Sequence, residues 1–273
     1  MAVFFFVSGF GLEKSYLRSE SYKKKYLIKR IPPVLFPYIA IMAVYCVFLA
    51  VFFPSNDPAR MAKDVLDASN SWYIISILLF YLVFWLLMII CKKHYAAMLI
   101  GAAVWFAAYV AVCKLLGLGS WWYNASVLLI VGMAWALYED KIIGFIKNHY
   151  YLVFAAAAVC FAAATVGKYK ADKLIPLPDI KVVCTALSAV FFVICVLLVS
   201  MKFRIGNRAL AFLGELSPEL YLIHGIFVLA LRNDSFRLEN DFLFVLISVC
   251  GSVLIAFALH MALKPLLALL RKR

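Results

Sequence analysis

Long apolar runs separated by short polar segments dominate this chain. A transmembrane helix needs about 20 apolar residues to cross roughly 30 Å of hydrocarbon. Runs that meet or approach this length lie at about 31–53, 71–91, 95–116, 121–137, 150–167, 182–201, 209–231 and 242–270. The pattern predicts an all-α fold, a polytopic transmembrane helix bundle with about eight full spans.

The first apolar run, from Ala2 to Leu12, is shorter than the others. About eleven residues reach only about 17 Å as an α-helix, which is half a span. We therefore expect a partial N-terminal span in addition to the eight. The loops are too short to form domains of their own, so residues 1–273 are expected to form a single membrane-embedded domain.

Composition supports the membrane assignment. The chain is 67% hydrophobic and 15% charged, with a mean hydropathy of +0.98, whereas a soluble domain is about half apolar and about a quarter charged. This excludes a soluble globular enzyme, a disordered tail and a disulfide-rich secreted module. The seven cysteines are odd in number and form no CxxC motif, so no metal or redox site is expected.

The distribution of charge predicts the orientation. The formal net charge is +13. When the loops are assigned alternately to two sides, one side holds 18 of the 27 Lys and Arg residues and carries a net charge of +12, against +1 on the other. The positive-inside rule makes the first side cytoplasmic. We expect a multi-pass protein of the cell membrane with a cytoplasmic C-terminus and no role in nucleic-acid binding.

A polar residue inside a span costs at least a few kcal/mol and is a functional candidate for that reason. The stretch 213–224, LGELSPELYLIH, is the most informative one. Ser217, Pro218 and Glu219 have the order of an N-cap, a proline at the first helical position and an acid that complements the helix dipole.

Ser217, Tyr221 and His224 follow one another on one face of the expected helix. Two interpretations are open. The face is a polar stripe lining an internal cavity, with free amide groups at its mouth that suit an anion, or it belongs to a capped helix whose Tyr and His bind neighbouring spans. His260, alone in an apolar helix, is a weaker candidate. No HExxH, Walker, GxSxG or GxGxxG motif occurs.

Three motifs in register along the chain resemble the acyltransferase 3 family of integral-membrane O-acyltransferases. FFFVSGF at 4–10 and the basic segment that follows it, 22–38, are similar to that family's second helix and loop. SWYII at 71–75 with Phe80-Tyr81 resembles its aromatic span start, and the stretch 213–224 resembles its late signature.

The resemblance implies transfer of an acyl group, usually acetyl, from cytoplasmic acyl-CoA to a hydroxyl of a cell-surface glycan or lipid-linked sugar. Acyl-CoA would be a co-substrate, with no bound cofactor and no metal. Residues expected to bind acyl-CoA or the acceptor are Ser8, Gly9, Lys25, Lys29, Arg30, Trp72, Tyr73, Tyr81, Ser217, Tyr221 and His224. The Lys and Arg side chains suit phosphate groups.

The family's first helix carries an arginine and, about ten residues later, a histidine regarded as the catalytic base. This sequence begins inside what corresponds to the second helix, so we expect an N-terminally truncated domain without that base. His224 matches another family position and is a weak catalytic candidate. We expect either that the start codon lies further upstream or that the copy is inactive. The alternative functions are a carrier or flippase for a polar or lipid-linked solute, and a non-catalytic scaffold.

Overall fold

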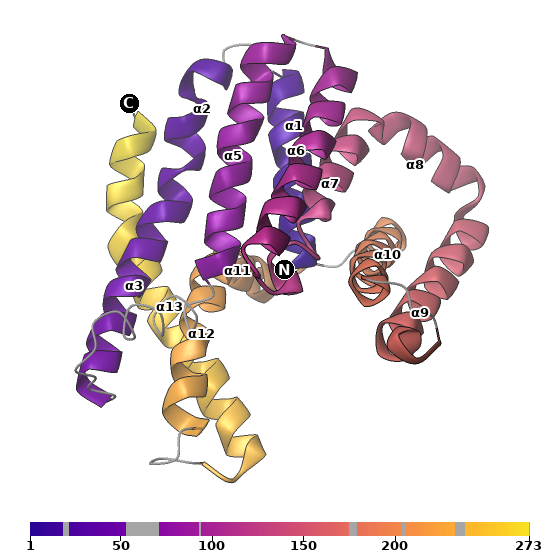
Figure 1. Ribbon diagram of the computed structural model, residues 1–273. Coiled ribbons are helices and arrows are strands. Elements are labelled where there is room, and N and C mark those ends of the chain that lie inside the picture. Colours follow the sequence, from indigo (N-terminus) through magenta and orange to yellow (C-terminus); the bar gives the residue numbers. More distant parts are fainter. Residues whose placement is uncertain are drawn as a thin grey trace. The chain divides into compact units, whose positions relative to one another are not determined.

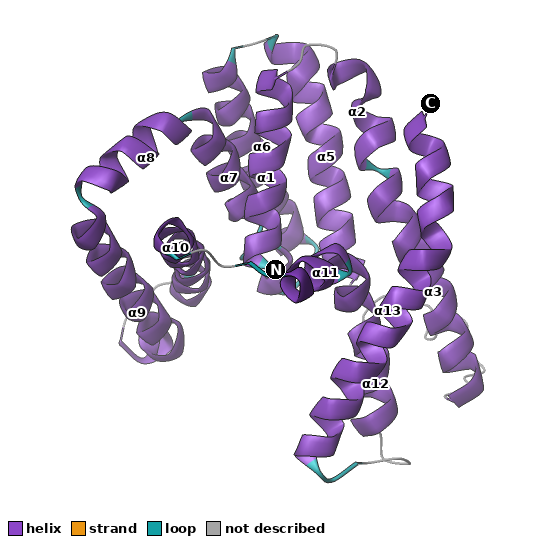
Figure 2. Ribbon diagram, turned by 180° about the vertical axis from the view of Figure 1, so that it is seen from behind, coloured by secondary structure: helices purple, strands orange, loops and turns teal. Residues whose placement is uncertain are grey.

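The computed structural model describes residues 1–18, 22–52, 71–92, 94–174, 179–203, 206–232 and 238–272, and these contain helices and no strand (Figure 2). The helices are α1 (Ala2–Arg18), α2 (Tyr22–Arg30), α3 (Pro32–Phe52), α5 (Ser71–Cys91), α6 (Tyr95–Leu115), the 3-10 turn η1 (Ser120–Trp122), α7 (Val127–Leu137), α8 (Glu139–Asn148), α9 (Tyr150–Leu174), α10 (Ile180–Lys202), α11 (Arg208–Glu215), α12 (Ser217–Arg232) and α13 (Asp241–Lys272).

Seven segments of the described chain are long and apolar enough to cross a membrane, and the pair α11–α12 makes eight if it counts as one span. The predicted all-α polytopic bundle is confirmed. The expected span 209–231 is broken, however, because α11 and α12 meet at an angle of 72°. α1 is longer than its apolar part and continues as a helix to Arg18.

The helices, which Figure 1 labels, divide into two compact units. Unit 1 contains residues Met1–Lys24 and Leu82–Ile205, and unit 2 contains Lys25–Tyr81 and Gly206–Arg273. α5 contributes its first half to unit 2 and its second half to unit 1. The single domain expected from the short loops remains a prediction.

In unit 1, α1 packs closely on α7 because two glycines let the backbones approach. A methyl group on Gly9 would overlap the carbonyl oxygen of Leu129, and one on Gly132 would overlap the carbonyl oxygen of Phe6. Apolar side chains gain nothing by leaving lipid for each other, so close backbone contact through small residues is the usual way for such helices to associate.

Three further contacts of unit 1 join the ends of different helices. Lys14 pairs with Glu139, Lys114 with Asp179, and the ammonium of Lys202 donates to the Tyr151 hydroxyl (2.7 Å). Each of these contacts joins two helix ends that the charge pattern assigns to the same side of the membrane. Between α9 and α10, the hydroxyls of Thr165 and Ser188 lie 3.0 Å apart.

In unit 2, α12 packs against α13 and α3, and α13 also contacts α3. Ile41 and Tyr45 of α3, Ile223 of α12 and Ala256 of α13 are buried in their common core. The hydroxyl of Tyr45 donates to the carbonyl of Leu222 (3.0 Å). Unit 2 as a whole contains nine of the eleven predicted binding residues.

The α1–α7 contact makes a stability prediction. Gly132→Ala places a methyl group against the backbone of α1, which cannot move aside as a side chain can, and should lower the free energy of unfolding by about 1–3 kcal/mol. Thermal unfolding in one detergent measures the change. Gly11→Ala is the matched control, since nothing lies within 4 Å of the added methyl group. Equal melting temperatures for the two variants would contradict the close approach.

Candidate functional site

Aromatic and hydroxyl side chains gather in unit 2 where α5 begins. The Tyr38 hydroxyl of α3 donates to the Ser71 hydroxyl (2.7 Å). The ring of Tyr73 meets that of Tyr221 edge to face, with the centroids 5.5 Å apart, and the ring of Trp72 meets that of Tyr73 in the same way, with the centroids 6.1 Å apart. The predicted residues Trp72, Tyr73 and Tyr221 therefore share one cluster, which we call the α5 aromatic cluster.

The position of this cluster differs from the prediction in one respect. The alternating assignment of loops expects Ser71 on the opposite side of the membrane from the beginnings of α3 and α12. In the structure, Ser71 contacts Tyr38, and Tyr73 contacts Tyr221, both within the first two turns of their helices. The charge count assigns each loop to one side of the membrane. It does not determine the depth at which a helix begins, which depends on the contacts of the first turn of that helix.

The start of α12 corrects the expected cap. The carbonyl of Leu216 accepts the amide N–H of Leu220 (2.9 Å), so Leu216 holds the cap position, not Ser217. The Ser217 hydroxyl instead donates to the carbonyl of Gly214 (2.7 Å). Only one residue separates α11 from α12, and the hydroxyl therefore reaches back to a carbonyl in the last turn of α11.

The face of α12 that carries Ser217, Tyr221 and His224 is not its buried face. His224 is exposed, and its Nδ1 lies 2.6 Å from the carbonyl oxygen of Tyr221 in the same helix. The buried side chains include Glu219 and Ile223. Both interpretations of the stripe stay open: His224 bonds within its own helix, and Tyr221 contacts Tyr73 of α5.

Glu219 and His260 form a polar contact that the sequence reasoning missed. Nδ1 of His260 lies 3.2 Å from Oε1 of Glu219, between α13 and α12. The side chain of Glu219 is 5% exposed and that of His260 27%. Oε2 of Glu219 is buried and has no hydrogen-bond partner among the described residues. An acidic residue in the first turn of a helix is ordinarily explained by its favourable interaction with the helix dipole. The residue order at 217–219 therefore gave no indication of a contact with a histidine 41 residues away.

Glu13 is a second buried acid that the sequence reasoning passed over. It lies near the end of α1 in unit 1 and is 2% exposed. Both of its carboxyl oxygens are buried without a hydrogen-bond partner in the described part of the chain. Lys14, beside it, pairs with Glu139 instead. A carboxyl held in this way costs free energy of folding.

The remaining predicted binding residues are Ser8, Gly9, Lys25, Lys29, Arg30 and Tyr81. Ser8 and Gly9 belong to unit 1, where Gly9 has a packing role. Lys29 is exposed and Arg30 half-buried at the end of α2, and the side chain of Lys25 lies outside the described part. Tyr81 is buried in α5. Their part in binding stays a prediction.

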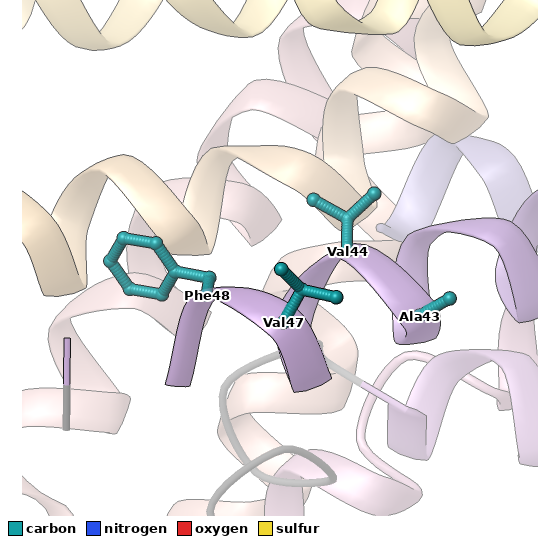
Figure 3. A pocket seen from close by; sticks show the side chains of 4 residues that line it. All are labelled: Ala43, Val44, Val47 and Phe48. Atoms are coloured by element: carbon teal, nitrogen blue, oxygen red, sulfur yellow. The ribbon is translucent and has the colours of Figure 1, made fainter. Parts of the chain in front are cut away.

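An open hollow of about 450 Å³ lies against α3 and offers no polar group for chemistry. Figure 3 shows the four residues that line it, Ala43, Val44, Val47 and Phe48, all from one helix and all hydrocarbon. Among the described residues, no three His, Cys, Asp or Glu side chains lie close enough to hold a metal ion.

The buried carboxyl of Glu13 makes a testable prediction. Glu13→Leu removes an unpaired carboxyl from an apolar site and should raise the free energy of unfolding by about 1–3 kcal/mol. Glu139→Gln is the control, because an ion pair at a partly exposed position contributes about 1 kcal/mol or less. Thermal unfolding of both variants in the same detergent gives the comparison, and a less stable Glu13→Leu would show that the carboxyl is stabilising.

Comparison with known proteins agrees with the motifs. The acyltransferase 3 family model, described as an acyltransferase domain, matches residues 1–261. No curated protein and no solved structure matches the chain. The match spans nearly the whole chain, including both units and the stretch 213–224, and the fold is a membrane-spanning helix bundle. The protein is therefore a member of the acyltransferase 3 family, an integral-membrane acyltransferase.

Proposed function

We propose that this protein transfers an acyl group, in the first instance acetyl, from cytoplasmic acyl-CoA to a hydroxyl of a cell-surface glycan or lipid-linked sugar. The observation that carries the proposal is the family match over residues 1–261. It defines the reaction class, acyl transfer, and the charge distribution and the polar groups of unit 2 support the finer assignment of donor and acceptor.

The donor is assigned from α2. Five of its nine residues are Lys or Arg, and its last turn ends with Lys29 and Arg30. The charge pattern assigns this helix to the cytoplasmic side, where CoA thioesters are made. CoA carries several phosphates, and the planar guanidinium of Arg30 suits bidentate contact with one of them. Arg30 leads through Ile31 into α3, so a phosphate held there would lie at the entrance to unit 2.

The acceptor is assigned from the groups available near α12. A sugar is recognised by hydrogen bonds to its hydroxyls and by stacking of its ring on aromatic side chains. The α5 aromatic cluster supplies Trp72, Tyr73 and Tyr221 for this. No chemistry other than acyl transfer from an activated thioester is required of the protein. It must hold the donor, orient the hydroxyl and move one proton.

The main alternative is a carrier or flippase for a polar or lipid-linked solute. It needs a continuous polar path through the helices, for which the sequence offers the stripe Ser217, Tyr221 and His224 of α12 and Asn124. The alternative is tested in vesicles: solute flux that does not depend on CoA thioesters would support it over the acyltransferase.

Arg30→Ala tests the donor site. The loss of a charge-assisted contact to phosphate should raise the KM for acyl-CoA about tenfold or more, because such a contact is worth about 1.5–3 kcal/mol. The kcat should change much less, since the phosphates lie far from the reacting carbonyl. Release of CoA thiol by the purified protein in vesicles, with a glycan acceptor present, measures both constants.

Lys147→Ala is the control for that experiment, as it removes one cation from α8 in unit 1. We expect its KM to match that of the unaltered protein. Absence of both acyl-CoA binding and acylation across several CoA thioesters would overturn the proposed function. An unchanged KM in Arg30→Ala would overturn the assignment of α2 alone.

A further inference from the structure

A lysine and two tyrosines meet where α9 begins and α10 ends, in unit 1. The Lys202 ammonium group donates to the Tyr151 hydroxyl (2.7 Å), and it lies 4.3 Å from the centroid of the Tyr151 ring and 5.2 Å from that of the Tyr150 ring. α9 and α10 pack against each other within this unit (Figure 1), so the contact is independent of how the units are arranged. We call these three residues the Lys202 cluster.

The aromatic side of the Lys202 cluster is held in place by its neighbours. The Tyr150 hydroxyl donates to the carbonyl of Leu198 in α10 (2.9 Å), and the Tyr150 ring stacks on that of Phe154 with the centroids 6.2 Å apart. Ile146 of α8 is buried in the same core as Leu198, between α9 and α10. The ammonium group therefore rests on a surface that is already ordered by packing before any ligand binds.

No carboxylate neutralises this ammonium group among the residues that the structure describes. The lysines at two other helix ends of unit 1 differ, since Lys14 pairs with Glu139 and Lys114 with Asp179. An ammonium group has three N–H donors, and the Tyr151 hydroxyl accepts from one of them. Because the tyrosine oxygen is the acceptor in that bond, its own O–H is left to donate elsewhere. The cluster thus offers further N–H donors, one O–H donor and a positive charge, a combination that suits an oxyanion.

The position of the cluster indicates that this anion belongs to a lipid. Tyr150 is the first residue of one candidate membrane span and Lys202 is the last residue of the next, so the ammonium group lies at the level of the phospholipid headgroups. The side chains of Tyr151, Leu152 and Phe203 are exposed at the same end of these helices. A phosphate that is attached to acyl chains can contact the cation and these apolar surfaces at once, and a free phosphate cannot.

We propose that the Lys202 cluster binds the headgroup phosphate of an anionic phospholipid, in the leaflet on the side that the charge count assigns to the cytoplasm. The phosphate oxygens accept from the Lys202 ammonium group and from the Tyr151 hydroxyl, and the acyl chains lie along Leu152 and Phe203. A zwitterionic lipid carries its own cation beside the phosphate, so it has no net charge with which to neutralise this lysine. The inference goes beyond acyl transfer and is independent of it, because none of these residues is expected to bind acyl-CoA or the acceptor.

Lipid competition separates this site from a contact that only joins α9 to α10. Native mass spectrometry of the purified protein, in detergent with equal amounts of phosphatidylglycerol and phosphatidylcholine, measures the ratio of the two bound lipids. We expect the unaltered protein to retain phosphatidylglycerol in preference, and Lys202→Gln to lower the ratio about fivefold, the effect of removing one lysine from an anionic surface. Tyr151→Phe keeps the ring but loses the O–H donor and should lower the ratio about threefold. Lys202→Arg keeps a cation that can lie on the same rings and should retain the preference.

Lys168→Gln is the matched control. Lys168 lies over a single tyrosine ring, that of Tyr169, with its ammonium group 5.4 Å from the centroid, near the other end of α9. Its lipid ratio should equal that of the unaltered protein. Melting temperatures give a second readout: phosphatidylglycerol should raise the melting temperature of the unaltered protein and of Lys168→Gln above the value in phosphatidylcholine, and should not raise that of Lys202→Gln.

Three results would overturn the proposal. An unchanged lipid ratio in Lys202→Gln, with a melting temperature lowered equally in both lipids, would show that the contact is structural. Displacement of phosphatidylglycerol by inorganic phosphate or coenzyme A would show that the site takes a soluble phosphate compound, and an equal loss in Lys168→Gln would show a general attraction of cations to the lipid. Should Lys202→Gln not fold, an unchanged ratio in Tyr151→Phe would overturn the proposal instead. None of these measurements requires acyl transfer, so failure of the proposed function would leave the lipid site standing.

Discussion

Inside a bilayer a polar group has no water to bind, so each one must find its partner within the protein. Helix formation provides hydrogen-bond partners for the backbone groups, and polar side chains must find theirs on neighbouring helices. In unit 2 the pairings follow from this constraint: Tyr38 with Ser71, Tyr45 with the carbonyl of Leu222, and His260 with Glu219. Each pairing joins two different helices. The polar groups, few in number, therefore determine how these helices are placed along one another, since apolar contacts with a neighbouring helix are worth little more than contacts with lipid.

The break between α11 and α12 is the second feature on which this arrangement depends. In a continuous helix over 208–232 the backbone groups would bond one another along one axis. The 72° turn at Leu216 instead leaves the carbonyls at the end of α11 and the amides at the start of α12 without partners in their own helices. Ser217 bonds one of those carbonyls, and Glu219 occupies the first turn, where the positive end of the helix dipole favours a carboxylate. Broken helices of this kind are tolerated in membrane proteins where the freed backbone groups find other partners. The break therefore leaves room for the Glu219 carboxyl group beside His260 and places that group at the positive end of the α12 dipole.

The sequence was sufficient for the features that depend on local patterns. The lengths of the apolar runs predicted the spans, because crossing hydrocarbon requires a fixed number of residues. The motifs at 4–10, 71–81 and 213–224 predicted the family, which the match over residues 1–261 confirms. The sequence was insufficient where an outcome depended on a second helix. The cap at Ser217 was predicted from residue order alone, but the position of α11 gave its hydroxyl another acceptor, Gly214. The pairing of Glu219 with His260 depends on how α12 packs on α13. The close packing at Gly9 depends on the register between α1 and α7. Neither relation leaves a periodic signal in one sequence.

The two buried acids show why burial alone does not identify a site. Glu13 and Glu219 are both almost fully enclosed, and each has an unpaired carboxyl oxygen among the described residues. They differ in what stands beside them. The cation next to Glu13, Lys14, pairs with Glu139 instead, and the described residues provide no hydrogen-bond partner for Glu13. Glu219 has the imidazole of His260 beside one oxygen and lies in the first turn of α12, where the helix dipole favours a carboxylate. An enclosed carboxyl without a partner is a cost to folding, whereas one that contacts a histidine at the start of a helix recovers part of that cost through the hydrogen bond and the helix dipole.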